Sequence, residues 1–181
     1  VVHDNYGGMR RIMDECRHRE ISRVGLTLST DGHERTQRMV GASYWVEQRA
    51  DGFFSPIPPL IMPAWQESAF NAWYRRYRPE AVVTSNFFLQ EVQAWSAQRR
   101  LHLGHELQLI NVNAAAAGPV AGIFQNPHAI GGIATRLVIE KIIRNDRGIP
   151  IQTQTTLSPG TWVEGSTLRA PRNPALRADA T

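Results

Sequence analysis

The sequence predicts an α/β protein with a doubly wound parallel sheet, and two observations indicate this fold class. Short apolar runs alternate with segments of helical periodicity through the first 113 residues, and the connections between them are short. This order is typical of βαβ units, in which helices cover both faces of a parallel sheet. Ligands of such sheets bind outside the carboxyl ends of the strands, so we expect a binding site there.

The individual elements follow from local patterns and turn signals. Met9, Ile12, Met13 and Cys16 recur at helical spacing, so they share one face of a first helix. Helices are expected at residues 9–19, 34–49, 64–77, 87–100 and 126–145. Strands are expected within residues 24–28, 58–63, 80–86, 106–113, 151–157 and 161–168. The helix at 126–145 is apolar on nearly every side, so it must be covered on more than one face.

The composition is that of an ordinary soluble globular domain. Of the 181 residues, 42% are hydrophobic and 20% are charged, and no apolar run approaches the length of a membrane span. No signal peptide is visible, and the single cysteine, Cys16, fits a reducing compartment. We therefore expect a cytoplasmic protein with no membrane partner. The net charge of +4 comes from arginines scattered among acidic residues, which does not favour a direct nucleic-acid surface.

Sequence motifs that would indicate catalysis, a cofactor or a metal are missing. The pair Gly7 and Gly8 does not fit either phosphate-loop pattern and is interpreted as a helix entry. No nucleophile elbow and no Ser, His and Asp set can be recognised. His102 and His105 have no third metal ligand near them in the sequence, so they are expected to be exposed loop histidines. The sequence thus predicts no enzyme activity, no cofactor and no metal site.

Polar side chains that directly follow strands are the candidates for ligand binding. Thr30, Asn86 and Asn113 occupy such positions at the expected ligand edge of the sheet. An asparagine amide offers donors and an acceptor, which suits a ligand rich in hydroxyl groups, although asparagine is equally a turn residue. Arg38 lies early in the helix after the first full strand. Its guanidinium could grip paired hydroxyls or a carboxylate, or simply face water.

Several stretches, taken in order, resemble the LacI/GalR family of bacterial transcriptional regulators, whose effector domain is periplasmic-binding-protein-like. The similar stretches are VVHDNYGGMRRIMDEC leading into ISRVGLTLS, RTQRMVGASYWV with an Arg and a Gly three apart, RPEAVVTSNFFLQEV, LQLINVN, IFQNPHAIGGIATRLVIEKI and SPGTWVEGSTL. Each stretch is degenerate alone. Their order through residues 1–169 identifies the chain as similar to the C-terminal part of that effector domain.

The resemblance implies two Rossmann-like subdomains joined by three crossing strands, with a sugar or another small metabolite in the cleft between them. Residues 1–122 would form the C-terminal effector-binding subdomain. Residues 123–157 would cross back and supply one helix and one strand of the N-terminal subdomain. Residues 158–169 would return to the first sheet, and residues 170–181 would be a disordered tail. The domain would thus be truncated at its N-terminal side, and the DNA-binding headpiece would lie outside this chain.

The resemblance also points to ligand-binding residues. Arg38 matches an arginine that contacts effector hydroxyls, and Asn86 matches a polar contact after its strand. Trp65 falls near an aromatic residue that packs on the apolar face of the ligand.

Three further residues complete this set of candidates. Asn113 stands where many family members carry Asp, and Phe87 replaces another common Asp, so the usual sugar specificity is not expected. Asp4 would lie at the hinge or in the cleft. Gln125 would lie on a crossing strand, where structural packing is favoured over ligand contact.

The expected function is effector sensing and dimerisation within a DNA-binding transcriptional regulator. A sugar or related metabolite would change the angle between the subdomains, and the absent headpiece would bind operator DNA. With half of the cleft absent, the 181 residues alone should bind the effector weakly or not at all. The alternatives left open are a periplasmic-type solute-binding protein for sugar transport and a doubly wound enzyme.

A homodimer or larger assembly is expected for two reasons. The helix at 126–145 would expose apolar area, which favours association. In the family, the helices that correspond to residues 65–77 and 87–99 build a dimer interface, which would give Phe88 and Trp95 a role beyond the core.

Overall fold

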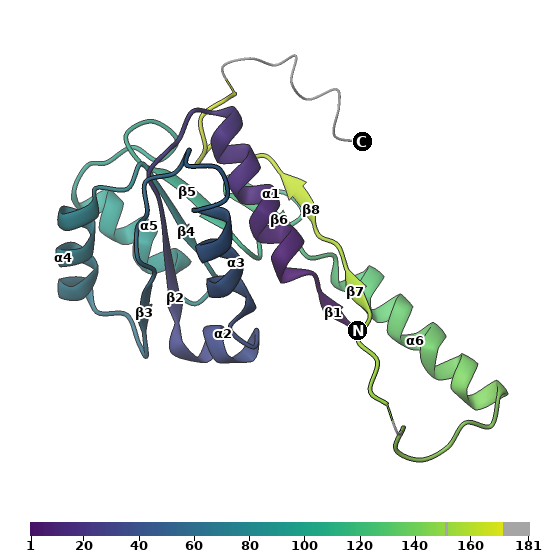
Figure 1. Ribbon diagram of the computed structural model, residues 1–181. Coiled ribbons are helices and arrows are strands. Elements are labelled where there is room, and N and C mark those ends of the chain that lie inside the picture. The colour runs from purple at the N-terminus through teal and green to yellow at the C-terminus, as the bar shows by residue number, and fades with distance from the viewer. Residues whose placement is uncertain (151, 172–181) are drawn as a thin grey trace.

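Six strands form one sheet in the computed structural model, which describes residues 1–150 and 152–171 (Figure 1). In spatial order they are β3 (Leu60–Met62), β2 (Val24–Ser29), β4 (Ala81–Thr84), β5 (Gln108–Asn111), β6 (Ala121–Phe124) and β8 (Thr161–Val163). The helices are α1 (Asn5–His18), α2 (Thr30–Arg35), α3 (Met39–Glu47), α4 (Glu67–Tyr77), α5 (Leu89–Gln98) and α6 (Pro127–Ile143). All neighbouring strands are parallel except β6 and β8, which are antiparallel. The predicted α/β fold with a parallel-dominated sheet is confirmed.

The strand order contains a topological switch point between β2 and β4. From β2 the chain moves outward to β3, returns past β2 to β4, and then continues to β5 and β6. The register pairs Leu26 of β2 with Val83 of β4, and Thr84 of β4 with Asn111 of β5. Because these strands are parallel, their carboxyl ends lie at one edge. The reversal of direction therefore opens a crevice at that edge.

Helices cover both faces of the sheet, with α1 and α3 on one face and α4 and α5 on the other (Figure 1). Each face of the sheet has its own hydrophobic core, and consecutive residues of β4 point into different ones. Val83 packs with Ile12 and Tyr44 on one face, whereas Val82 packs with Phe70 on the other. All five of these side chains are fully buried. Complete burial of one such side chain contributes about 1.5–3 kcal/mol, so the two cores position the strand ends firmly.

The single helix predicted at residues 34–49 is wrong, because the structure has two helices there. Gln37 and Arg38 separate α2 from α3, and their φ angles of 50° and 63° are left-handed. Two consecutive left-handed residues cannot continue a right-handed helix. α2 begins directly after β2, where the Ser29 hydroxyl accepts a hydrogen bond from the Gly32 N–H at 3.0 Å. The helix therefore starts four residues earlier than predicted, and Arg35 is its last residue.

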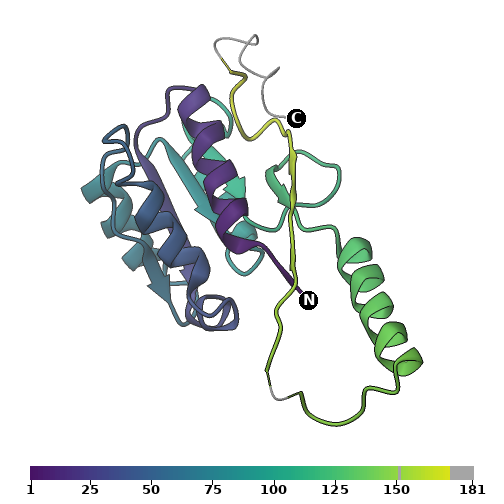
Figure 2. The same ribbon diagram turned by 45° about the vertical axis from the view of Figure 1, so that its right-hand side comes forward.

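An extension carries α6 away from the layered body, as both ribbon views show (Figures 1 and 2). None of the residues of α6 is buried. At its base, β1 (Val2–His3) and β7 (Leu157–Ser158) form a separate parallel pair. The assignment of residues 123–157 to a second subdomain, with boundaries at 122 and 158, stays a prediction.

The C-terminal strands are shorter than predicted. Among the described residues of 151–157 only Leu157 is in a strand, and β8 ends at Val163. Beyond β8, Thr167 keeps backbone hydrogen bonds to Leu109 and Pro119, and its hydroxyl adds two more: it donates to the Leu109 carbonyl at 2.7 Å and accepts from the Ala121 N–H at 3.0 Å. The predicted disordered tail lies outside the described residues from 172 onward. No helix in the described ranges has both the length and the apolarity that a membrane crossing needs.

Phe88 and Trp95 belong to the core, which corrects the expectation that they serve an interface. Their exposed fractions are 4% and 3%. Trp95 packs edge-on against Phe70 with ring centroids 4.9 Å apart, and its indole N–H donates to Asn71 Oδ1 at 2.8 Å. An aromatic cluster fills the layer between the sheet and helices α4 and α5, so the fold itself uses these rings. The homodimer stays a prediction.

Candidate functional site

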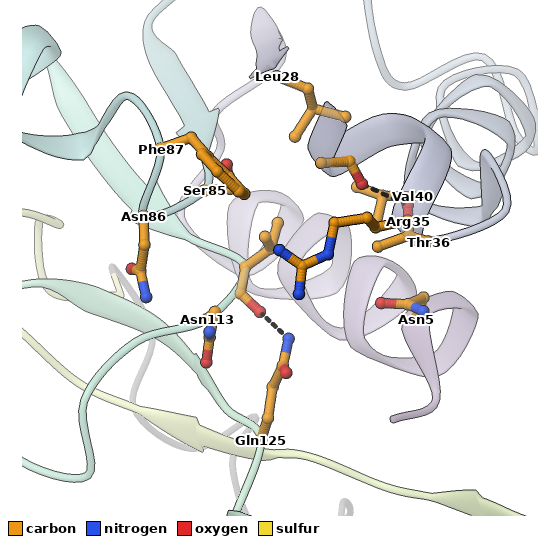
Figure 3. A pocket seen from close by; sticks show the side chains of 12 residues that line it. Asn5, Leu28, Arg35, Thr36, Val40, Ser85, Asn86, Phe87, Asn113 and Gln125 are labelled. Carbon is orange, nitrogen blue, oxygen red and sulfur yellow. Dashed lines mark hydrogen bonds between the residues drawn. The ribbon is translucent and has the colours of Figure 1, made fainter. Parts of the chain in front are cut away.

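A pocket of about 370 Å³ lies at the carboxyl ends of β2, β4, β5 and β6, beside the switch point (Figure 3). Apolar side chains form part of its wall and amide and hydroxyl groups form the rest. The lining residues are Asn5, Leu28, Gly32, Arg35, Thr36, Val40, Ser85, Asn86, Phe87, Val112, Asn113 and Gln125.

Three of these strands, β4, β5 and β6, are each followed by a polar side chain that lines the pocket, because they end at this edge. Asn86 follows β4, Asn113 follows β5 and Gln125 follows β6. Arg35 reaches the pocket from the last residue of α2, and Asn5 comes from the first residue of α1, directly after β1. The pocket thus collects residues from the whole switch-point edge and from the segments that lead to the extension.

Hydrogen bonds beneath the pocket orient its amide side chains. The buried Asn111 donates from Nδ2 to Asn86 Oδ1 at 2.6 Å and accepts at Oδ1 from the Asn113 N–H at 3.0 Å. Gln125 donates from Nε2 to the Val112 carbonyl at 3.1 Å. These bonds leave Nδ2 of Asn86 as a donor and Oε1 of Gln125 as an acceptor toward a ligand.

The charge of the described pocket wall is positive. Arg35 is the one charged side chain among the described lining residues, and it faces Asp31 in an exposed ion pair of 3.8 Å. The Ser85 hydroxyl oxygen is shielded from solvent and has no hydrogen-bond partner within the described residues. Phe87 leaves 47% of its surface exposed, so its ring is available to pack on a ligand. A small polar molecule with one apolar face fits such a wall.

His3 lies behind the pocket on β1, and it is held neutral near pH 7. Burial lowers the pKa of its imidazole, and this effect outweighs the hydrogen bond with the Ser158 backbone and the nearby Asp4 carboxylate, which both raise it. Its Nδ1 atom is buried without a hydrogen-bond partner in the described part of the chain. The base of the extension therefore carries no buried charge at this point.

Three of the six sequence-predicted binding residues come together in this pocket. Asn86, Asn113 and Gln125 all line it, although they are separated by up to 39 positions along the chain. Thr30, also singled out after a strand, is exposed at the start of α2 and does not line the pocket. Whether the three residues bind a ligand remains a prediction, but their convergence follows from the parallel register.

The other three predicted residues lie elsewhere. Arg38 pairs with Glu34 at 3.1 Å, and it precedes α3 with its side chain outside the lining. Trp65 packs against Phe70, with ring centroids 4.9 Å apart, and it does not line the pocket. Asp4 caps α1 by accepting a hydrogen bond from the Gly7 N–H at 2.9 Å.

Sequence reasoning missed Arg35 and Ser85, which line the pocket, and Asn111, which supports it from beneath. The sequence predicts one helix over residues 34–49, whereas the break between α2 and α3 leaves Arg35 at the pocket and Arg38 outside it. Ser85 was available to the rule that selected Asn86, since it follows the same strand. Asn111 carries a different signal: it is a polar residue at the end of a buried strand, and such a side chain needs hydrogen-bond partners.

A parallel sheet with a switch point and a polar pocket at its carboxyl edge gives the chain a doubly wound α/β fold of the periplasmic-binding-protein-like class. Within that class, the chain has the fold of the effector domains of LacI-family transcriptional regulators. It resembles a transcription regulator like protein from Staphylococcus haemolyticus, with 15% identity and a TM-score of 0.69, over 93% of this chain and 62% of that one.

Two other solved structures have a similar fold. A periplasmic binding protein/LacI transcriptional regulator from Alkaliphilus metalliredigens, solved in complex with D-xylulofuranose, has 18% identity and a TM-score of 0.71, over 92% of this chain and 65% of that one. A LacI family transcriptional regulator from Mycobacterium smegmatis has 18% identity and a TM-score of 0.66, over 94% of this chain and 66% of that one.

The likeness concerns the fold, because these identities are low. No family model and no curated protein matches the sequence. The chain spans 62%, 65% and 66% of the three regulator chains, so it corresponds to a part of each.

Proposed function

We propose that this chain is the effector-sensing part of a bacterial LacI-type transcriptional regulator and binds a hydroxylated small molecule. The observation that carries the proposal is the pocket itself, in which polar groups from β4, β5 and β6 converge at the switch point. A sugar or related metabolite is the ligand class that amide and guanidinium groups beside an exposed aromatic ring suit. The D-xylulofuranose complex of a protein with the same fold supports this class.

The pocket also touches two segments that lead to the extension. Asn5 follows β1, and Gln125 lies between β6 and α6. A ligand that contacts both residues binds more tightly to one orientation of α6 relative to the sheet than to another. Because a ligand shifts an equilibrium by its differential affinity for the two states, binding would select one orientation. In a regulator this change would be transmitted to a DNA-binding part outside these 181 residues.

The partners of the proposed regulator follow from the same role. It would act as a homodimer on operator DNA in the cytoplasm, with no catalytic step of its own. The alternative, a solute-binding protein for sugar transport, shares the fold, but the similar structures named above are described as regulators. We therefore favour the regulator.

DNA selection with the complete polypeptide that contains these residues would test the proposal. Enrichment of genomic fragments should yield a discrete operator, and one sugar or sugar derivative should change its affinity about 5–150-fold, the usual range of allosteric coupling. Gln125→Ala should reduce this coupling, whereas Thr30→Ala, at the same edge but outside the pocket, should preserve it. A protein that binds a sugar but no specific DNA would support the transport class instead.

A further inference from the structure

We propose that the pocket takes the carboxylate group of a hydroxylated acid, such as an aldonic or uronic acid. The proposal rests on the ligand-binding function proposed above and names the class of ligand. It depends on the charges and hydrogen-bonding groups that the described lining residues present.

The charge of the wall favours an anion. Among the twelve lining residues there is one guanidinium, that of Arg35, and no carboxylate. In Figure 3 this guanidinium lies amid Asn5, Asn113 and Gln125, pointing into the hollow. Its partner Asp31 is 3.8 Å away, and both side chains are mostly exposed, so the pair contributes little and a ligand can replace it.

The second carboxylate of this helix does not oppose an anion in the pocket. Glu34 is held by Arg38, with Arg38 Nη2 3.1 Å from Glu34 Oε1. Each arginine pairs with an acid of α2, but only Arg35 lines the pocket, and its pair with Asp31 is the longer one at 3.8 Å. This difference makes Arg38 a matched control for Arg35.

The hydrogen-bonding groups of the wall favour a ligand that accepts. Asn86 has its Oδ1 engaged by Asn111, which leaves its Nδ2 to donate, and the Ser85 hydroxyl has no partner in the described ranges. A carboxylate has acceptors only, so donors and a guanidinium satisfy it fully. Paired sugar hydroxyls, in contrast, bring donors of their own, and no charged acceptor in the described wall receives them.

The remainder of the pocket suits the hydroxylated carbon chain of the same acid. Gln125 offers Oε1, and the exposed Asn113 amide offers a donor and an acceptor. Leu28, Val40 and Phe87 supply an apolar surface for the carbon skeleton. The volume of about 370 Å³ fits a small ligand of this kind, because small-molecule pockets commonly start near 300 Å³.

NMR titration of the 181-residue chain tests the proposal, because it detects weak binding residue by residue. Three matched pairs would be compared: glucose with glucuronate, galactose with galacturonate, and xylose with xylonate. In at least one pair the acid should bind about tenfold more tightly than the neutral sugar and shift the amide signals of Asn86, Asn113 and Gln125. Equal binding within every pair would overturn the proposal and leave the proposed function standing.

Two further outcomes separate the alternatives. Glucose 6-phosphate is included as a second anion, and tenfold tighter binding of the phosphate than of glucuronate would assign the pocket to phosphate esters instead. If no sugar, acid or phosphate shifts any signal of the pocket, the proposed ligand-binding function fails together with the ligand class.

Three substitutions test whether Arg35 makes the contact with the carboxylate of the ligand. Arg35→Gln should weaken binding of the acid about tenfold and remove the preference for it, whereas Arg38→Gln should change the affinity by less than about threefold. Asn113→Asp places a carboxylate in the pocket at nearly constant size, so it should reverse the preference toward the neutral sugar. A larger loss with Arg38→Gln than with Arg35→Gln would overturn the assignment. Unchanged spectra outside the pocket would show that each variant is folded.

Discussion

Asn111 orients Asn86 from beneath, through a hydrogen bond of 2.6 Å from its Nδ2 to the Asn86 Oδ1. Asn111 is 1% exposed at the end of β5, whereas Asn86 is exposed at the pocket. Its own Oδ1 accepts from the Asn113 N–H at 3.0 Å, so one buried amide fixes both pocket asparagines. The pocket is therefore pre-organised by a residue that does not line it.

The substitution Asn111→Ala tests this support. It should weaken ligand binding about 5–20-fold, and it should lower the free energy of unfolding by about 1–3 kcal/mol because buried partners lose their hydrogen bonds. Titration and urea denaturation measure the two effects. In a double-mutant cycle with Asn86→Ala, the two losses of binding energy should not add, since both act on one amide. Full additivity would show that Asn111 does not act through Asn86.

The strand pattern was predictable because it depends on local sequence. Apolar runs bounded by turns located β2, β4 and β5, and the parallel order then required their carboxyl ends to share an edge, which brought Asn86 and Asn113 together. The rule needs no knowledge of side-chain packing, so it was enough for the fold and for placing Asn86 and Asn113 in one pocket; that they bind a ligand stays a prediction.

The exceptions depend on backbone geometry and long-range contacts. Residues 36–39 (TQRM) contain no glycine or other signal for two consecutive left-handed residues. The helix break after Arg35, and therefore the position of Arg35 at the pocket, could not be predicted from the sequence. Trp65 packs against Phe70 and also against Phe88, which lies 23 residues further along the chain, so its place in the core depends on tertiary packing. Asp4 directly precedes a helix, and a carboxylate at such a position can either cap the helix or bind a ligand. The sequence does not distinguish these two roles.

Gly122 permits the close approach of β6 to β5. A Cβ at this position would lie 1.9 Å from the Asn111 carbonyl oxygen, which is backbone and cannot move aside. Gly122→Ala should therefore lower the free energy of unfolding by about 2–4 kcal/mol and disturb the Asn111 network. Gly131→Ala on α6, where an added Cβ meets nothing within 4 Å, should instead be neutral or stabilise by up to about 1 kcal/mol. Thermal denaturation compares them, and similar midpoints would refute the packing argument.

Arg19 joins the end of α1 to the C-terminal segment, and its side chain is completely buried. It pairs with Glu15 and with Glu164, the latter at 3.0 Å, and its Nε donates to the Arg169 carbonyl at 2.7 Å. Arg19→Met should cost about 1–3 kcal/mol, because the buried carbonyls of Glu15 and Arg169 lose their donor while the Glu15 carboxylate keeps only its pair with Arg11. Arg144→Met breaks an exposed pair with Glu140 and should cost less than about 1 kcal/mol. Urea midpoints should separate the two variants clearly, and equal midpoints would contradict the role of burial.

Cys16 should be unreactive in the folded protein. Burial raises the pKa of its thiol to about 12 from an ordinary value of 9.0, so at pH 8 the thiolate fraction falls about a thousandfold relative to the unfolded chain. Alkylation by iodoacetamide should be slow in buffer and fast in denaturing urea. Rapid labelling in buffer would mean that α1 opens locally.

The same pKa shift makes stability depend on alkaline pH. The folded state keeps the thiol proton longer than the unfolded state, so this contribution to stability is intact below about pH 9 and falls as the pH rises toward 12. Denaturation series at increasing pH, compared between the parent chain and Cys16→Ala, measure the contribution. The parent should lose stability more steeply than the variant over this range, and parallel curves would contradict the shift.

The apolar surface of α6 should make the 181-residue chain associate with itself. Ile142 and Ile143 are 71% and 79% exposed, and Val138 is 57% exposed, so the helix presents apolar area along its outer turns. Water disfavours such a surface, and contact with a second copy removes it. Sedimentation velocity should therefore show a weight-average mass that rises with concentration. The double variant Ile142→Glu and Ile143→Glu should return the chain to a monomer, whereas Met39→Glu with Val46→Glu, on the exposed side of α3, should not. A parent chain that stays monomeric at high concentration would exclude association through α6.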